Sequence, residues 1–324
     1  MSALTAAVIG LGMGANHARA YAGLAQTDLI ALCDPDEDSL NALGDELGIQ
    51  LRFTDHRDLL EVGGLDVCSV CSPDHCHASQ TVDLLAAGVH VLCEKPMAPS
   101  LQECRSMVQA AREAGRSLMV GQSYRFQGRF RAIKDLVDRG ELGELYLVQS
   151  EQWNNLQGVG GAGNWRNVPG VRHPFVGGCH AMDLCRWVAG EVVEVSAYGN
   201  HLAFPEQPAD DCVIANVRFA GGCLGRVLVS SGCRRPYSAS LDVSGTRGTI
   251  EGFGISRGRD DPFRPLELPA ETDSIAAELA GFVRSVLEGT PAPVTAEDGF
   301  GTMAACFAAV ESAPTGRPVV PQGL

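Results

Sequence analysis

The sequence predicts an α/β Rossmann domain, built on a doubly wound parallel sheet, followed by an α+β domain with an open, mainly antiparallel sheet. Three observations lead to this prediction. Short apolar strand patterns alternate with helical patterns as far as residue 122, which is typical of a parallel sheet covered by helices. From residue 144 onward, strand patterns mostly follow one another directly, which favours antiparallel pairing. The chain has 324 residues, of which 45% are apolar, and this is enough for two cores.

The first half of the chain carries the alternating pattern. Its expected strands lie near residues 6–9, 28–33, 50–53, 65–71, 89–93 and 117–121. Helical patterns separate them, for example at 16–25 and 100–114. We therefore assign residues 1–122 to the Rossmann domain and residues 123–324 to the second domain.

A glycine-rich loop follows the first strand and fits the pattern G-x-G-x-x-A. It reads Gly10-Leu11-Gly12-Met13-Gly14-Ala15. In such a loop the first glycine permits a tight turn, the second lets the backbone approach a pyrophosphate, and the small last residue lets helix and strand pack closely. The helix expected at 16–25 adds free N–H groups and a positive dipole end. The loop is therefore predicted to bind a dinucleotide.

The second strand ends in a carboxylate, Asp34, which lies 24 residues after Gly10. An acidic residue at this distance is expected to bind the hydroxyl groups of the adenosine ribose. Further acidic residues follow at 36–38, and no arginine lies nearby to neutralise a 2′-phosphate, so NAD is favoured over NADP. The alternative is that Asp34 only stabilises a turn or caps a helix.

Lys95 follows the fifth expected strand and is one of only two lysines in the chain, the other being Lys134. A lysine can be tuned to exchange a proton, whereas an arginine remains protonated. The carboxyl end of a strand in a parallel sheet is also where ligands bind. Lys95 is therefore a candidate catalytic residue, and the alternative is a surface lysine that closes a loop.

The second half is dominated by successive strands, near residues 144–153, 192–199, 212–219, 223–231, 238–244 and 248–253. Gly221 and Gly222 predict a tight hairpin turn between two of them. Helical patterns lie at 128–139, 273–289 and 295–311. A sheet with helices on one side leaves its other face open, and such a face often becomes a subunit interface. We expect a homodimer or homotetramer formed through this sheet.

A long glycine-rich segment at 154–178 precedes the helical pattern that carries His180 and Asp183. Such a loop, loaded with aromatic and basic groups, favours a binding role over a linker. His180 and Asp183 are three residues apart and therefore share one face of a helix. This pairing suits acid–base chemistry, and the alternative is a structural histidine.

Composition excludes several classes of partner. A net charge of −14 and a pI of about 5.0 argue against nucleic acid and anionic membranes. No apolar run reaches the roughly 18 residues of a membrane span, and no signal-peptide pattern begins the chain. The twelve cysteines are scattered, which suggests free thiols in a cytoplasmic protein. Cys71, His75 and His77 are close in sequence, yet no second ligand pair completes a zinc site, so no metal is expected.

Together these segments resemble the glucose-fructose oxidoreductase / inositol dehydrogenase / rhizopine catabolism family, shortened to Gfo/Idh/MocA. The resemblance covers almost the whole chain, and Glu-Lys-Pro combined with Gly-Gly-x-His-x-x-Asp is quite specific to the family. The matching segments are the loop at 10–15, Asp34, Ser72-Pro73-Asp74-His75-Cys76-His77, Glu94-Lys95-Pro96, Tyr124-Arg125-Phe126, Asn164-Trp165-Arg166 and Gly177-Gly178-Cys179-His180-Ala181-Met182-Asp183.

The resemblance implies an NAD(P)-dependent enzyme that transfers a hydride between its cofactor and a hydroxyl or ketone carbon. The implied substrate is a sugar, an inositol or a related polyol, and the implied site lies between the domains. Cofactor contacts are implied for Ser72, Pro73, His77, Glu94 and Lys95. The final helix, about 295–311, is implied to pack back on the Rossmann domain.

The sequence departs from the family pattern at Val176. The family usually has an aspartate four residues before the catalytic histidine, and here that residue is valine. Asp183 is then the carboxylate still within reach of His180, since a carboxylate beside a histidine can orient its ring. Alternatively, His180 acts without a partner, and His173 is a spare candidate acid.

The implied mechanism gives the substrate hydroxyl proton to His180 while Lys95 stabilises the oxygen, and Lys95 is the alternative base. The substrate-binding candidates are Tyr124, Trp165, Arg166, His173 and Asp183. For the aromatic ones, the alternative is packing at the domain junction. Two other functions stay open. One is a redox-neutral enzyme that oxidises, eliminates or epimerises and then reduces again, and the other is an NAD-responsive regulator without enzymatic activity.

Overall fold

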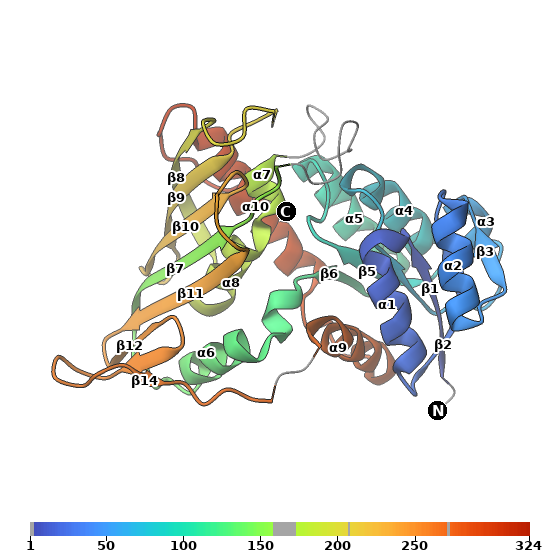
Figure 1. The fold of residues 1–324 in the computed structure, drawn as a ribbon, viewed down its shortest axis with the longest axis horizontal. Helices are drawn as coiled ribbons and strands as arrows, with labels where there is room; N and C mark the ends of the chain where they lie inside the picture. The colour runs from blue at the N-terminus through green and yellow to red at the C-terminus, as the bar shows by residue number, and fades with distance from the viewer. Residues whose placement is uncertain (1–2, 158–172, 207, 271–272) are drawn as a thin grey trace. The chain divides into compact units, whose positions relative to one another are not determined.

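The computed structural model describes residues 3–157, 173–206, 208–270 and 273–324. The chain divides into two compact units (Figure 1). The first comprises Met1–Ser123 with Asp273–Phe300, and the second comprises Tyr124–Thr272 with Gly301–Leu324. Trp165 and Arg166, two of the residues expected to bind substrate, lie outside the described residues.

The first unit contains a six-stranded sheet with the order β3-β2-β1-β4-β5-β6, in which all pairs are parallel. The predicted doubly wound sheet is confirmed. In this order the chain reverses direction across the sheet between β1 and β4, and ligands bind at the carboxyl ends of the strands there. The strands are β1 (Leu4–Ile9), β2 (Thr27–Cys33), β3 (Leu51–Phe53), β4 (Val67–Val70), β5 (His90–Glu94) and β6 (Leu118–Gly121).

The helices of the first unit connect these strands. They are α1 (Leu11–Gly23), α2 (Glu37–Leu47), α3 (His56–Leu59), α4 (Asp74–Ala86), α5 (Leu101–Ala114) and the late helix α9 (Ser274–Glu288). Helix α1 begins at Leu11, five residues earlier than the sequence pattern indicated. The glycine loop itself forms its first turns, because Gly10 alone supplies the sharp bend, with a φ of 83°.

Helix α9 belongs to the first unit, although the sequence analysis assigned every residue after 122 to the second domain. Its buried face includes Leu279, Phe282 and Val283, and it packs on α1 (Figure 1). An apolar helix face needs a partner surface, and α1 supplies it from a distant part of the sequence. The following helix, α10 (Ala296–Ser312), begins in the first unit and ends in the second.

The second unit contains an eight-stranded sheet with the order β14-β13-β12-β11-β7-β10-β9-β8. All its pairs are antiparallel except β7 with β10, which run parallel. The expected open, mainly antiparallel sheet is therefore confirmed. The strands are β7 (Leu145–Trp153), β8 (Val192–Asn200), β9 (Cys212–Phe219), β10 (Leu224–Ser230), β11 (Ser238–Gly245), β12 (Gly248–Glu251), β13 (Gly254–Ser256) and β14 (Arg264–Pro265).

Helices pack on one face of this sheet. Helix α8 (Cys179–Ala189) contacts β7, β10 and β11, and α7 (Pro174–Gly177) contacts β9 and β10 (Figure 1). The short 3₁₀ helix η1 (Ser123–Phe126) and α6 (Gly128–Asp138) lead into the sheet. Within the described part of the chain, no helix is both long enough and apolar enough to span a bilayer.

Candidate functional site

Three glycines shape the loop after β1, and they do so for different reasons. A Cβ at Gly10 would lie 2.5 Å from the backbone nitrogen of Ser72, and a Cβ at Gly14 would lie 2.8 Å from Cγ1 of Val8. At Gly12, by contrast, a Cβ would meet no atom within 4 Å. Packing within the protein thus explains Gly10 and Gly14, and it does not explain Gly12. An open glycine at the start of a helix leaves room for a pyrophosphate to approach, so this loop fits the phosphates of NAD.

This contrast predicts opposite results for two alanine variants. Gly12→Ala should leave the thermal midpoint of unfolding nearly unchanged and weaken NAD binding by about tenfold or more, because the new methyl group occupies ligand space. Gly14→Ala should destabilise the protein by about 1–3 kcal/mol through overpacking against Val8. Calorimetric titration with NAD and thermal unfolding of both variants test this. An unchanged NAD affinity in Gly12→Ala would contradict the assignment.

Asp34 stabilises the glycine loop directly. Its Oδ2 accepts a hydrogen bond from the Leu11 N–H at 2.6 Å, and its Oδ1 accepts one from the Asp36 N–H at 2.8 Å. The turn role considered as the alternative is therefore real. These two hydrogen bonds do not use all the acceptor capacity of the Asp34 carboxylate, because each oxygen can accept more than one hydrogen bond. Asp34 is half-buried at the carboxyl end of β2, so its remaining lone pairs fit a ribose.

Lys95 stands at the carboxyl end of β5 in a turn that Glu94 secures. Glu94 is buried, and its Oε2 accepts the Lys95 backbone N–H at 3.0 Å. Its Oε1 lies 3.3 Å from Nε2 of His17. Glu94, expected from the resemblance to contact the cofactor, is thus held by the protein instead. The Lys95 side chain is half-buried, and its ammonium group forms no ion pair with the residues that the structure describes.

A buried polar network lies behind Glu94, and sequence reasoning missed it. Nδ1 of His17 lies 3.1 Å from Oγ of Ser69, which in turn lies 3.0 Å from the hydroxyl of Tyr21. Glu278 of α9 joins the cluster, since a ring nitrogen of His17 and carboxylate oxygens of Glu94 and Glu278 all lie within 4.8 Å of one another. Both ring nitrogens of His17 already have hydrogen-bonding partners. One indication of this network is present in the sequence, which is that His17 lies among mainly apolar residues on the buried face of α1.

Ser72, Pro73 and His77 follow β4 and contribute mainly to local structure. The Ser72 hydroxyl donates to Oε1 of Gln80 at 2.6 Å, and Pro73 precedes the first turn of α4. His77 is buried, and both of its ring nitrogens lie within hydrogen-bonding distance of backbone carbonyl oxygens. The resemblance implied that His77 contacts the cofactor. In the structure, both ring nitrogens instead have partners within the protein. The ring ties two loops of the protein together.

The imidazole of His180 is held in the second unit by stacking. Its ring lies on that of Tyr124, with a centroid distance of 4.1 Å and an interplanar angle of 12°. Tyr124 also stacks on Phe130 at 5.5 Å. Both Tyr124 and His180 are at least 94% buried, with exposures of 6% and 4%. Tyr124 was expected to shape the substrate pocket, but its ring is used to fix His180, which agrees with the packing alternative.

Asp183 does not orient His180, and this corrects the sequence-based expectation. Its Oδ2 and Oδ1 accept hydrogen bonds from Nε and Nη2 of Arg125 at 2.8 and 2.7 Å. Oδ1 also accepts the hydroxyl of Thr302 at 2.9 Å. Asp183 is 1% exposed, so it has no surface for a substrate. It serves as the anion of a buried ion pair that connects η1, α8 and α10.

His173 and Val176 belong to α7 and its cap. Nδ1 of His173 accepts the Phe175 N–H at 3.2 Å, and burial lowers the pKa of this imidazole although Asp210 acts in the opposite sense. A neutral imidazole with Nδ1 as acceptor has its proton on Nε2. Val176 is buried, with 2% exposure, so the chain has an apolar side chain where the family usually has a carboxylate.

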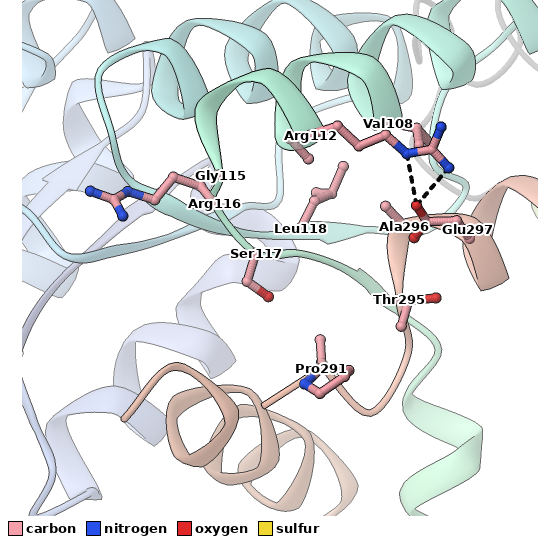
Figure 2. A pocket seen from close by; sticks show the side chains of 12 residues that line it. Val108, Arg112, Gly115, Arg116, Ser117, Leu118, Pro291, Thr295, Ala296 and Glu297 are labelled. Carbon is pink, nitrogen blue, oxygen red and sulfur yellow. Dashed lines mark hydrogen bonds and ion pairs between the residues drawn. The ribbon is translucent and has the colours of Figure 1, made fainter. Parts of the chain in front are cut away.

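A cavity of about 280 Å³ lies in the first unit. Figure 2 shows Arg112 of α5 reaching Glu297, with Ser117, Leu118 and Pro291 nearby. Ser117 precedes β6, so the cavity adjoins the amino ends of the strands, whereas the glycine loop and Lys95 follow carboxyl ends. It is therefore not the dinucleotide site.

Comparisons with known proteins identify both parts of the chain. Residues 4–122 match a family model described as "Oxidoreductase family, NAD-binding Rossmann fold", and residues 130–251 match the GFO/IDH/MocA C-terminal domain. The chain is 27% identical to myo-inositol 2-dehydrogenase of Thermotoga maritima, over 96% of this chain and 97% of the relative. It is 26% identical to D-apiose dehydrogenase of Rhizobium rhizogenes, over 98% of each.

A solved structure supports the fold over the full length. Levoglucosan dehydrogenase in complex with NADH superimposes with a TM-score of 0.90, at 22% identity, over 100% of both chains. This likeness concerns the fold alone. The relatives named above are dehydrogenases, which does not favour a regulator without enzymatic activity.

Proposed function

The chain belongs to the Gfo/Idh/MocA oxidoreductase family and has an NAD-binding Rossmann domain, and from this premise we propose that it is a dehydrogenase or reductase of a sugar, inositol or related polyol. One observation carries the proposal. The Lys95 ammonium stands at the carboxyl end of β5, its turn is secured by Glu94, and it forms no ion pair with the described residues. A cationic donor held in this way suits an oxygen that develops negative charge.

Two residues share the proton and charge chemistry in this proposal. Bound NAD supplies the two-electron oxidation or reduction. His180 takes the proton of the substrate hydroxyl during oxidation and returns it during reduction, while Lys95 donates a hydrogen bond to the same oxygen. Stacking on Tyr124 fixes the plane of the His180 ring. The aspartate that the family usually has four residues before this histidine is replaced by Val176, which cannot hydrogen-bond to the ring. Lys95 as the base remains the alternative assignment.

The substrate class rests on chemistry shared by the relatives. Myo-inositol and D-apiose, named for the two relatives, are both polyhydroxylated. Trp165 and Arg166 lie in the glycine-rich segment and are proposed to bind substrate, because aromatic faces suit the C–H side of a sugar ring and a guanidinium group suits hydroxyls.

We also propose a homo-oligomer formed through the open face of the second sheet. Tyr198 and Ile214 are paired across β8 and β9 on this face and are 67% and 41% exposed, and Leu228, their neighbour on β10, is buried. A row of apolar side chains across neighbouring strands favours a second copy as its cover. All twelve cysteines are unpaired, which supports a reducing compartment such as the cytoplasm.

An activity panel tests the proposed function. Purified protein is incubated with NAD or NADP and with inositols, aldoses, glycosides and their keto forms, and nicotinamide absorbance is followed. We expect turnover with NAD, and kcat/KM about 100-fold higher than with NADP, because Asp34 and its acidic neighbours repel a 2′-phosphate. Product formation without net NADH would instead indicate the redox-neutral enzyme. NAD binding without turnover on any substrate would contradict the proposal.

A further inference from the structure

His77 lies in the first turns of α4 and bridges two loops of the first unit. Its Nδ1 is 2.9 Å from the carbonyl oxygen of Pro96, and its Nε2 is 2.8 Å from the carbonyl oxygen of Ser72. A backbone carbonyl can only accept a hydrogen bond. Both contacts are hydrogen bonds only if both ring nitrogens donate, and a neutral imidazole carries a proton on only one of them. Two carbonyl acceptors, one at each ring nitrogen, favour the imidazolium form, which has two N–H donors.

We propose that His77 is a positioning residue for Lys95: as a buried imidazolium, it ties the turn that carries Lys95 to the loop that follows β4. This inference rests on the role proposed above for Lys95. It differs from the cofactor contact implied by the family resemblance, because both donors of the ring are used within the protein and the residue is only 1% exposed.

The bridge connects Lys95 to the glycine loop through a short chain of contacts. Pro96 follows Lys95 directly, so the hydrogen bond to its carbonyl fixes the backbone on one side of the lysine. Glu94, itself in contact with His17, fixes the other side. Ser72, the second acceptor of His77, packs so closely on Gly10 that a Cβ there would lie 2.5 Å from its nitrogen. These contacts fix the turn that carries Lys95 relative to the glycine loop at the start of α1.

The surroundings of His77 support the charged form. Burial by itself lowers the pKa of the ring. The Cys93 side chain on β5 raises it, by the negative charge of its thiolate form and by a hydrogen bond to the ring, and Asp74 on α4 and the Pro96 carbonyl raise it further, to about 9. Sγ of Cys93 also lies 3.4 and 3.8 Å from the carbonyl oxygens of Glu94 and Met97. The positive end of α4 opposes the charge, and Asp74 in the first turn offsets it.

The sign of the pH dependence follows from this direction. The pKa in the folded protein is raised above the ordinary histidine value of about 6.5, so the stabilisation is complete below that value and is lost as the pH rises through about 9. Deprotonation removes one of the two donors and leaves a buried carbonyl without its partner, which is unfavourable. The bridge should therefore open on the alkaline side.

The first experiment reads the protonation state without any substrate. In protein labelled with ¹⁵N-histidine, both ring nitrogens of His77 should carry a proton at neutral pH, and one proton should be lost with a midpoint near pH 9. A ring that carries a proton on one nitrogen at neutral pH would overturn the inference. Because neither NAD nor substrate is present, a failure here is distinct from a failure of the proposed function.

The second experiment exploits the two lysines of the chain. With ¹³C-labelled lysine, only Lys95 and Lys134 give side-chain signals, and Lys134, which pairs with Asp138 on α6, is an internal reference. In His77→Gln the Lys95 signal should shift or broaden while that of Lys134 stays in place. In the wild type, the Lys95 signal should change with the same alkaline midpoint as the His77 ring. This measurement does not need the variant, so it tests the inference even if His77→Gln does not fold. A Lys95 signal that changes neither in His77→Gln nor with the titration of His77 in the wild type would refute the positioning role.

Activity supplies the third readout. His77→Gln should lower kcat by about 10- to 100-fold, the usual effect of losing a residue that orients another functional group, with a smaller change in KM. The variant should also lose the alkaline limb of the pH profile that belongs to His77. His201→Gln, which replaces an exposed histidine outside the site, is the matched control and should leave kcat unchanged. A kcat equal to the wild type in His77→Gln would contradict the inference.

Discussion

Replacing Lys95 with alanine is expected to lower kcat by about 1,000-fold while the fold and the affinity for NAD are retained. Removing a single preorganised donor to a developing oxyanion costs roughly 100- to 1,000-fold, and a general acid–base role adds to this. The fold should survive because the Lys95 ammonium forms no ion pair with the described residues, and Glu94 accepts the backbone N–H, which alanine also has.

Two further variants sharpen this test. Lys134→Ala removes the other lysine, whose ammonium pairs with Asp138 one helical turn away, and it should leave turnover unchanged. Lys95→Arg keeps the positive charge but does not exchange a proton near neutral pH. Residual turnover in Lys95→Arg well above that of Lys95→Ala would assign the lysine to charge stabilisation, and equal losses would favour Lys95 as the base. Steady-state kinetics and calorimetric titration with NAD are the measurements. Wild-type turnover in Lys95→Ala would exclude the residue from the chemistry.

Asp183→Asn is expected to lower the free energy of unfolding by about 3–5 kcal/mol, because it leaves a buried guanidinium without its counter-ion. The Asp183 carboxylate receives two hydrogen bonds from Arg125 and a third from Thr302. The side chains of Arg125 and Asp183 are only 7% and 1% exposed, so water cannot replace the lost partner. Turnover should fall as well, since η1 carries both Arg125 and the Tyr124 ring that supports His180.

Chemical denaturation measures this effect against a matched exposed pair. Arg112 and Glu297 are about half exposed and also form an ion pair. Glu297→Gln should therefore cost no more than about 1 kcal/mol. The double replacement Arg125→Met with Asp183→Leu should cost less than Asp183→Asn alone, because it removes both charges together. If Asp183→Asn and Glu297→Gln had equal effects, burial would not make the Arg125–Asp183 pair more important to stability than an exposed pair.

The features that sequence reasoning predicted correctly have local causes. The glycine loop follows from the steric needs of a tight turn, and the two sheets follow from strand patterns that alternate with helices or succeed one another. In β9, buried Val213, Ala215, Val217 and Phe219 alternate with exposed residues such as Ile214, as the period-two pattern predicted. Such patterns depend on neighbouring residues alone and can be read from one chain.

The sheet of the second unit shows where this reasoning stops. A succession of strands predicts neighbours paired in sequence order, yet β7 lies between β10 and β11 and runs parallel to β10. Helix α9 likewise returns to the first unit and brings Glu278 to the His17 and Glu94 cluster. An amphipathic pattern shows that a face is buried without showing which surface covers it.

The sequence by itself determined the two-domain fold, the dinucleotide loop and the place of Lys95 at the end of a strand. Only the tertiary structure decided which partners the buried polar groups have. His17 meets Glu94 across 77 residues, Arg125 meets Asp183 across 58, and Thr302 meets Asp183 across 119. Even His77 in α4 and Pro96 after β5, 19 residues apart, come from separate segments. A buried polar group must find a partner, but periodicity specifies only that it is buried. The partner depends on how distant segments pack, which is why Asp183 binds Arg125 and not His180.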